Sequence, residues 1–334
     1  MPVFKQHISV VVRGIRAFLD LEAGVMRAGA VPGTQQRAAD HKASLARANA
    51  AANGLRPENI IWIFGSGRSG STWLSAMMGD MSRHTLWGEP WVGTLFGNFY
   101  YIQGEGRHNN SQFILGSHRE SWLGSIRNFV VDAAATTFPN LKEDDYLVIK
   151  EPNGSVGAPL LMEALPESRM ILLARDPRDV VASSLDARRE GGWNFERNKD
   201  RRRRKGKQPP QKGSVIFAKD RASNYAQGMG NAKMAYDAHD GPKALVRYED
   251  LRVDALGTMR RMYSTLGVPV NEEELERVVE KHSWENIPEG KKGEGKFYRK
   301  ASPGAWREDL TPEQAEMVAN VTAPLLEELY PEKA

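Results

Sequence analysis

The stretch Ile60–Met78 constrains the fold most, because an apolar run there meets a glycine- and serine-rich turn and then helical sequence. The segment Ile60–Phe64 is β-branched or aromatic and too short for a helix, so it predicts a buried strand. Gly65, Gly67 and Gly70 permit positive φ angles and close approach of a ligand to the backbone. N–H groups at the start of the helix would then face an anion. The segment predicts a phosphate-binding loop, although a plain connection between strand and helix is an alternative.

The loop differs from that of a nucleoside-triphosphate site. Its spacing from Gly65 to Gly70 matches the first part of such a loop, but Ser71 stands where the lysine would be. The cation of this loop is Arg68, and the next predicted strand ends in Lys150 instead of a metal-binding aspartate. We therefore expect a phosphate site without a metal ion. A P-loop kinase remains an alternative, and it predicts Mg²⁺-dependent use of ATP.

Strand and helix patterns alternate along the chain, and this alternation predicts the fold class. The later predicted strands cover residues 146–150, 169–174 and 244–248, and the predicted helices cover residues 158–165, 176–185, 256–266, 272–282 and 311–329. Such alternation implies right-handed crossovers and a three-layer α/β fold, a parallel sheet with helices on both faces. Ligands of these sheets bind at the carboxyl ends of the strands. The loop at 66–72, Lys150 and Arg175 should therefore meet at one rim.

The amino-acid composition limits which cellular compartment and which binding partners can be expected. The 334 residues could hold one large α/β domain, and Lys plus Arg exceed Asp plus Glu by 46 − 42 = 4. This mildly basic balance suits an anionic ligand and does not by itself demand nucleic acid, which we do not expect as a partner. The absence of cysteine excludes disulfides and thiolate metal sites and is compatible with the cytoplasm.

The chain is expected to comprise a helical extension over residues 1–56 and a domain over residues 57–334. The amphipathic segment Ile8–Leu21 lacks a signal-peptide cleavage site. Docking of that segment on the protein's own core or on a second copy, as a homo-oligomer, is favoured over peripheral membrane contact. Within the domain, residues 186–214 contain a basic run that predicts an exposed, mobile insert. That run could instead be an anion-recruiting lid, or a nucleic-acid or acidic-lipid binding module.

Three separate segments together resemble the sulfotransferases that use 3′-phosphoadenosine 5′-phosphosulfate (PAPS). The segment Gly67–Trp73 resembles that family's loop for the 5′-phosphosulfate. Arg175 and Ser183 resemble its 3′-phosphate motif, and Phe297–Thr311 is similar to its C-terminal nucleotide-binding segment. The resemblance implies a P-loop-like sulfotransferase fold, PAPS as donor, 3′,5′-adenosine bisphosphate (PAP) as product and no metal.

The resemblance also implies which residues bind the donor. They are Gly67, Arg68, Ser69, Gly70, Ser71, Thr72, Trp73, Arg175, Ser183, Trp284, Arg299, Lys300 and Ala301. Trp73 and Trp284 match positions beside the adenine in the family. Arg299 and Lys300 would add two cations for the 3′-phosphate. Ala301 stands where the family usually has glycine.

The implied reaction is in-line transfer of a sulfuryl group to an acceptor hydroxyl, which needs charge stabilisation and a base. Arg68 and Lys150 are the candidates for charge stabilisation. Cytosolic members place a histidine two residues after the lysine, but Pro152 stands there in this chain. Glu89 resembles the glutamate base of tyrosyl-protein sulfotransferases and is expected as the general base, with Glu151 second. The acceptor class stays open among carbohydrates, lipids, peptide tyrosines and small alcohols.

Overall fold

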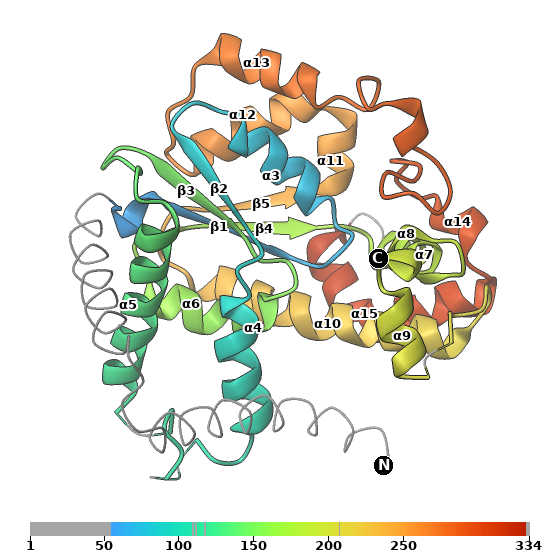
Figure 1. Ribbon diagram of the computed structural model, residues 1–334, viewed down its shortest axis with the longest axis horizontal. Coiled ribbons are helices and arrows are strands. Elements are labelled where there is room, and N and C mark those ends of the chain that lie inside the picture. Colours follow the sequence, from blue (N-terminus) through green and yellow to red (C-terminus); the bar gives the residue numbers. More distant parts are fainter. Residues whose placement is uncertain (1–54, 109, 111, 117, 207, 332–334) are drawn as a thin grey trace, which may run out of the picture. The chain divides into compact units, whose positions relative to one another are not determined.

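The computed structural model describes residues 55–331 except positions 109, 111, 117 and 207 (Figure 1). Within these residues, five parallel strands form one sheet in the order β2-β3-β1-β4-β5. The strands are β1 (Ile60–Gly65), β2 (His84–Gly88), β3 (Tyr146–Lys150), β4 (Arg169–Ala174) and β5 (Lys243–Arg247). The expected helix over Ile8–Leu21 lies outside the described residues, as does nearly all of the expected 1–56 extension.

Helices cover both faces of the sheet and give three layers (Figure 1). On one face lie α4 (Val92–Gly97), α5 (Arg119–Thr137), α6 (Ala158–Ala164), α10 (Val215–Ala238) and α15 (Pro312–Leu329). On the other lie α3 (Ser71–Gly79), α11 (Tyr248–Val253), α12 (Ala255–Thr265) and α13 (Glu272–Lys281). The predicted three-layer α/β class is confirmed. Among the described residues, no helix has the length and apolar character needed to cross a bilayer.

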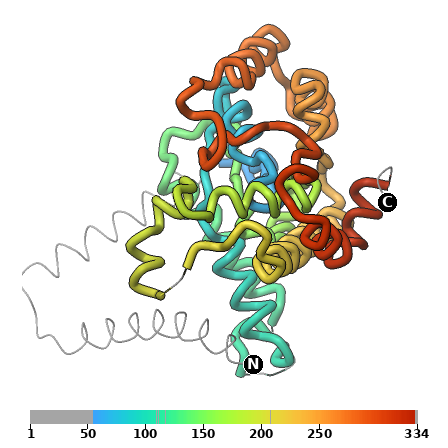
Figure 2. Tube along the Cα trace, turned by 90° about the vertical axis from the view of Figure 1, so that its right-hand side faces the viewer, coloured from blue at the N-terminus to red at the C-terminus, as the bar shows by residue number. Residues whose placement is uncertain are grey.

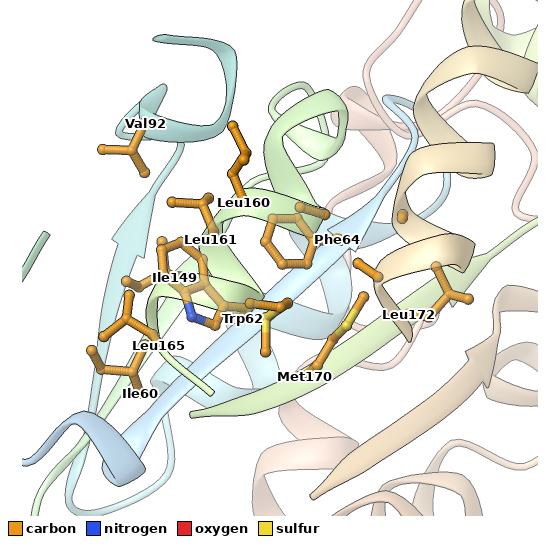
Figure 3. Packing of buried hydrophobic residues seen from close by; sticks show 14 of the residues in the cluster. Ile60, Trp62, Phe64, Val92, Ile149, Leu160, Leu161, Leu165, Met170 and Leu172 are labelled. Carbon is orange, nitrogen blue, oxygen red and sulfur yellow. The ribbon is translucent and has the colours of Figure 1, made fainter. Parts of the chain in front are cut away.

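Successive side chains of β1 point to opposite faces of the sheet and so belong to its two hydrophobic cores. Ile60, Trp62 and Phe64 pack on the α5–α6–α10 side, and Figure 3 shows the rings of Trp62 and Phe64 among aliphatic neighbours. Ile61 and Ile63 face the α3–α12 side. All five side chains are fully buried, which explains the continuous apolar run in the sequence. Strand β1 is therefore the centre of the sheet, and its carboxyl end is held in a fixed position.

The strands predicted over 60–64, 146–150, 169–174 and 244–248 are confirmed to within one residue at each end. Two features of the helix after β4 are also confirmed, because Asp176 accepts a hydrogen bond from the N–H of Arg178 (2.9 Å) and Pro177 occupies the first turn of α7 (Pro177–Arg188). Sequence analysis assigned no element to β2, α5 or α10. Strand β2 is an edge strand of mixed polarity whose side chains are half-buried or exposed, so it lacks the apolar run that identified the others.

The basic segment, expected as an exposed, mobile insert, is largely exposed and contains helical structure that the sequence analysis did not assign. Its first residues complete α7, and two short helices follow, α8 (Trp193–Arg197) and α9 (Lys199–Arg204). Lysine, arginine and aspartate run through α9, and the first two favour helix. The guanidinium of Arg202 also donates a hydrogen bond to the carbonyl of Gln208, which folds the following segment back on the helix. Figure 1 shows α7, α8 and α9 beyond the arrowheads of β4 and β5.

Candidate active site

The loop after β1 leads into α3 without a side-chain cap. Its N-cap is Gly70, in the left-handed region at φ 90°, and no side chain accepts a hydrogen bond from the first turn. The N–H groups of Ser71 and Thr72 have no acceptor among the described residues. Of the three glycines expected to use positive φ, only Gly70 does, whereas Arg68 does so at φ 74°. Gly65 is needed for space instead, because a Cβ there would lie 2.6 Å from the carbonyl oxygen of Leu173.

Arg68 projects from this loop toward α7 and the C-terminal segment. Its Nε donates to Ser183 Oγ (3.0 Å), and its Nη2 donates to the carbonyl of Phe297 (2.9 Å). Burial, followed by the repulsion of the neighbouring cations Arg175, Arg188 and Arg299, lowers the pKa of Arg68 to about 10. The loop, α7 and the C-terminal segment thus bring several cations to one place.

Arg175 follows the carboxyl end of β4 and is almost completely buried. Its Nη1 donates to the carbonyl of Arg68 (2.9 Å), and its guanidinium lies 4.1 Å from the centre of the Tyr248 ring. Its Nε is buried and has no hydrogen-bond acceptor among the described residues. A buried guanidinium with an unused donor suits an anionic ligand.

The C-terminal segment contributes Arg299, Lys300 and Ala301. Asp309 orients the two cations, since its carboxylate accepts from Arg299 Nη1 (2.6 Å) and from Lys300 Nζ (3.1 Å). Ala301 has a positive φ of 50°. This value lies in the left-handed region, which favours glycine, the residue that the resembled family usually has at this position. Its carbonyl accepts a hydrogen bond from Arg252 Nε (2.8 Å), which fixes the backbone of this segment.

Two tryptophans flank Arg252. Its guanidinium lies 5.5 Å from the ring centre of Trp73 and 5.9 Å from that of Trp284. The indole N–H of Trp73 donates to the carbonyl of His282 (2.8 Å), so α3 and the segment after α13 are held together. Both indoles are half-buried and line the same cavity. They leave aromatic surface for a planar group.

Lys150 and Glu89 form an ion pair at the ends of β3 and β2. Lys150 Nζ lies 2.7 Å from Glu89 Oε1 and 3.4 Å from Thr72 Oγ1. The second carboxylate oxygen of Glu89 accepts from Asn153 Nδ2 (2.9 Å). Glu89 itself has a positive φ of 56°, and such strained backbone is concentrated at functional sites. A carboxylate and an ammonium group are thereby fixed beside the uncapped end of α3.

Glu151 is placed differently from Glu89. Its side chain is 1% exposed, and its Oε1 accepts from the N–H of Val92 (3.0 Å) at the start of α4. Burial raises the pKa of Glu151 to about 7. Glu151 lies close enough to Glu89 and Lys150 for their charges to act on its pKa, but it does not line the cavity described below.

These groups surround a cavity of about 1170 Å³ at the carboxyl edge of the sheet. All predicted site residues line it except Ser69, which is fully buried and donates to the carbonyl of Ser66 (2.7 Å). Sequence analysis missed several lining residues, which come from α7 to α11 and from the segments after β2 and β3. They include Trp91, Asn98, Asn153, Arg188, Trp193, Arg197, Arg201, Arg221, Asn224, Gln227, Tyr248 and Arg252. No local motif identifies them, because helix packing brings them to the cavity.

A search of the described residues finds no group of three or more His, Asp or Glu side chains that could hold a metal ion. The polar groups around the cavity are mainly guanidinium and ammonium groups, hydroxyls and side-chain amides, with the single carboxylate of Glu89 among the described lining residues. Cationic groups of this kind bind phosphate and sulfate oxygens directly.

Comparisons with known proteins agree with this geometry. The chain is similar to cytosolic sulfotransferase 17 of Arabidopsis thaliana, with 26% identity over 203 residues, 50% of this chain and 53% of that protein. It therefore spans about half the length of the curated relative it matches. Its fold is similar to that of mouse sulfotransferase SULT7A1 complexed with PAP (11% identity, 84% of this chain and 89% of that one, TM-score 0.50).

The fold is also similar to that of sulfotransferase STF9 from Mycobacterium avium, with 15% identity, 89% of this chain and 86% of that one covered, and a TM-score of 0.52. At such identities the two structures establish the fold alone. The family model described as the sulfotransferase domain matches residues 58–330. Because that match covers most of the chain, the protein belongs to the sulfotransferase family.

Proposed function

We propose that the protein transfers a sulfuryl group from PAPS to an acceptor hydroxyl. The observation that supports this most is the meeting of Arg68, Arg175 and Arg299, from three distant segments, at one cavity. Like charges repel, and of these three only Arg299 has a carboxylate partner among the described residues, Asp309. Their meeting therefore favours a multiply charged anionic ligand. Membership of the sulfotransferase family favours sulfuryl transfer over the kinase alternative.

The cavity lining suits the parts of this donor. The free N–H groups of Ser71 and Thr72 would receive the 5′-phosphosulfate, and Arg175 with Arg299 would receive the 3′-phosphate. The two indoles beside Arg252 would flank the adenine. The mouse sulfotransferase of similar fold was crystallised with PAP, which supports the same choice of nucleotide here.

Lys150 and Glu89 are the proposed catalytic pair. The donor supplies an activated sulfuryl group, and the ammonium of Lys150 would neutralise charge that develops on the leaving phosphate. The carboxylate of Glu89 would take the proton of the acceptor hydroxyl, and its bond from Asn153 holds it in position. Arg68 would bind the donor from the α7 side, where its guanidinium already contacts Ser183.

Replacement of Glu89 by glutamine tests its proposed role. We expect Glu89→Gln to lower kcat by about 100-fold or more, because a general base typically contributes 10²–10⁴-fold. PAP affinity should stay within about threefold of wild type. Initial rates with labelled donor and calorimetric titration with PAP measure the two quantities, and Glu190→Gln, at an exposed position, is the matched control. Wild-type kcat in Glu89→Gln would remove this residue from the mechanism.

Three further proposals concern the bounds of the catalytic domain, the location of the protein in the cell and the side on which the acceptor enters. Residues 57–334 are proposed as the catalytic domain, which the family match over 58–330 supports. A cytoplasmic location is proposed from the relative named as a cytosolic sulfotransferase. The hydroxyl-bearing acceptor is proposed to enter on the side of the cavity that Trp91, Asn98 and Asn224 line.

A further inference from the structure

A second group of arginines lines the cavity beyond those expected to bind the donor. It consists of Arg188, Arg197, Arg201 and Arg221, from the end of α7 and from α8, α9 and α10. We call this group the acceptor-side arginines. They come from four consecutive helices, of which α7, α8 and α9 lie beyond the carboxyl ends of the strands and α10 runs along one face of the sheet (Figures 1 and 2).

The acceptor-side arginines lack ion-pair partners among the described residues. None of the four makes an ion pair or a side-chain hydrogen bond there. Asp220, the residue before Arg221, attracts that guanidinium without forming either contact. Arg189, the sequence neighbour of Arg188, behaves in the opposite way, because it pairs with Asp186 (3.0 Å) and Glu294 (2.9 Å). Nε of Arg221 is buried without an acceptor among the described residues. Carboxylates are therefore available nearby, but they do not neutralise this group.

Burial and mutual repulsion act on the two inner members. The pKa of Arg188 falls to about 10, first because the group is buried and then because Arg221 and Arg202 are close. Burial likewise lowers the pKa of Arg221. Unpaired, partly desolvated like charges are unfavourable unless an anion joins them. Such an arrangement is typical of a binding site rather than of a solvated surface run.

The acceptor-side arginines continue outward from the cations assigned to the donor. Arg188 lies at the boundary, because its charge acts on Arg68 and is itself acted on by Arg221 and Arg202. Arg299, in contrast, is held by Asp309. Arg221 and Asn224 lie on one face of α10, three residues apart, and both line the cavity. A further amide, Gln227, continues this polar wall. None of the residues assigned to the donor lies on α10, so this wall is available to the acceptor.

We infer that the acceptor carries an anionic group in addition to its hydroxyl, and that Arg188 and Arg221 bind this group. A sulfate, phosphate or carboxylate would fit, because planar guanidinium forks bind all three through paired hydrogen bonds. Arg197 and Arg201 are exposed and lie toward solvent, so they would attract the same group as it enters. This inference rests on the proposed function, since it names the substrate class of the same site.

The test uses the full-length protein saturated with PAP and titrated with inorganic sulfate at constant ionic strength. We expect sulfate to bind the wild-type complex and to bind Arg188→Met/Arg221→Met at least tenfold more weakly. The matched control is Arg203→Met/Arg204→Met, which removes two exposed charges from α9 that do not line the cavity. In that control sulfate affinity should change by less than about twofold. Thermal unfolding of each variant confirms that it is folded.

The outcomes separate this inference from the proposed function. If PAP binds the wild type but sulfate does not, or if sulfate binds both double variants equally, the acceptor assignment is wrong and the donor assignment stands. If PAP affinity falls in Arg188→Met/Arg221→Met as steeply as sulfate affinity, these arginines belong to the donor site and the inference is overturned. If the wild type binds no PAP, the proposed function fails and the inference fails with it.

Discussion

Glu151 combines deep burial with an anchoring contact, since its carboxylate accepts from the N–H of Val92. Burial raises its pKa from 4.5 to about 7, so between these values the folded protein holds a proton that the unfolded chain has released. Its contribution to stability is therefore full below pH 4.5 and is lost as the pH rises toward 7. Glu151→Gln should flatten this part of the stability–pH curve, which denaturant unfolding at several pH values measures. An unchanged slope, equal to that of Glu190→Gln, would contradict this role.

Ala301 carries backbone strain that a single substitution can relieve. Its φ of 50° lies in the left-handed region, which costs about 1–2 kcal/mol for a residue with a Cβ. Part of the gain from Ala301→Gly is offset by the greater freedom of glycine in the unfolded chain, so we expect a net stabilisation of about 0.5 kcal/mol.

The control for Ala301→Gly is Ala305→Gly. Ala305 has a φ of −63° and is buried, so the same change there should lower the free energy of unfolding. Chemical denaturation measures both variants. Destabilisation by Ala301→Gly as large as that by Ala305→Gly would contradict the strain.

Residues with a local motif could be predicted from the sequence, and residues placed by packing could not. Arg175 and Ser183 stand out because the first follows a buried strand and the second lies within the recognisable helix after it. The partners of Arg299 at Asp309 and of Lys150 at Glu89 lie 10 and 61 residues away, and no pattern joins them. The same holds for Arg188 and Arg221, which meet only because α7 packs on α10.

At the scale of elements, the turn into α3 depends on Gly70. Its φ is 90°, and an added Cβ would lie 2.5 Å from the ring of Tyr248. Gly70→Ala should lower the free energy of unfolding by about 2–4 kcal/mol, from left-handed strain and overpacking together. PAP affinity should fall as well, because the free N–H groups of α3 would move. Denaturant unfolding and calorimetric titration measure the two effects.

Gly124 offers the opposite case on α5. A Cβ there meets nothing within 4 Å, and the residue is helical. Gly124→Ala should stabilise the protein by up to about 1 kcal/mol and leave PAP affinity unchanged. Equal losses of stability in Gly70→Ala and Gly124→Ala would show that the turn before α3 has no special requirement for glycine.

Buried strands and helices could be predicted from the sequence more readily than exposed ones. Strands β1, β3 and β4 are almost wholly buried and appear in the sequence as apolar runs. The capping box of Thr311 and Gln314 likewise identifies the start of α15. Sequence analysis missed helix α10, because alanine, glycine and asparagine interrupt its apolar periodicity, although its buried face packs along α15. It also missed the helices of the basic segment, because a run of charges indicates solvent exposure and does not indicate a backbone conformation.

At the scale of the whole domain, strand order creates the site. Because β1 lies between β3 and β4, the loop before α3 has Lys150 on one side and Arg175 on the other. Alternating strands and helices predict such a rim, whereas the position of β2 at the edge cannot be derived from them. That position decides where Glu89 lies, since Gly88 pairs with Lys150. The meeting of residues from the ends of β1, β3 and β4 at one rim could thus be predicted, while the cavity-lining residues of α8, α9 and α10 required the structure.

The most direct test is thermal unfolding of the wild-type protein with PAP in the presence of a metal chelator. A ligand at 100 times its dissociation constant stabilises the folded state by about 2.7 kcal/mol, which should raise Tm by several degrees. Adenosine 5′-monophosphate, which lacks the 3′-phosphate, should give a much smaller shift, and Arg175→Met should reduce the PAP shift. No shift with PAP, or a shift that appears only with ATP and Mg²⁺, would contradict a metal-free site for a doubly phosphorylated adenosine.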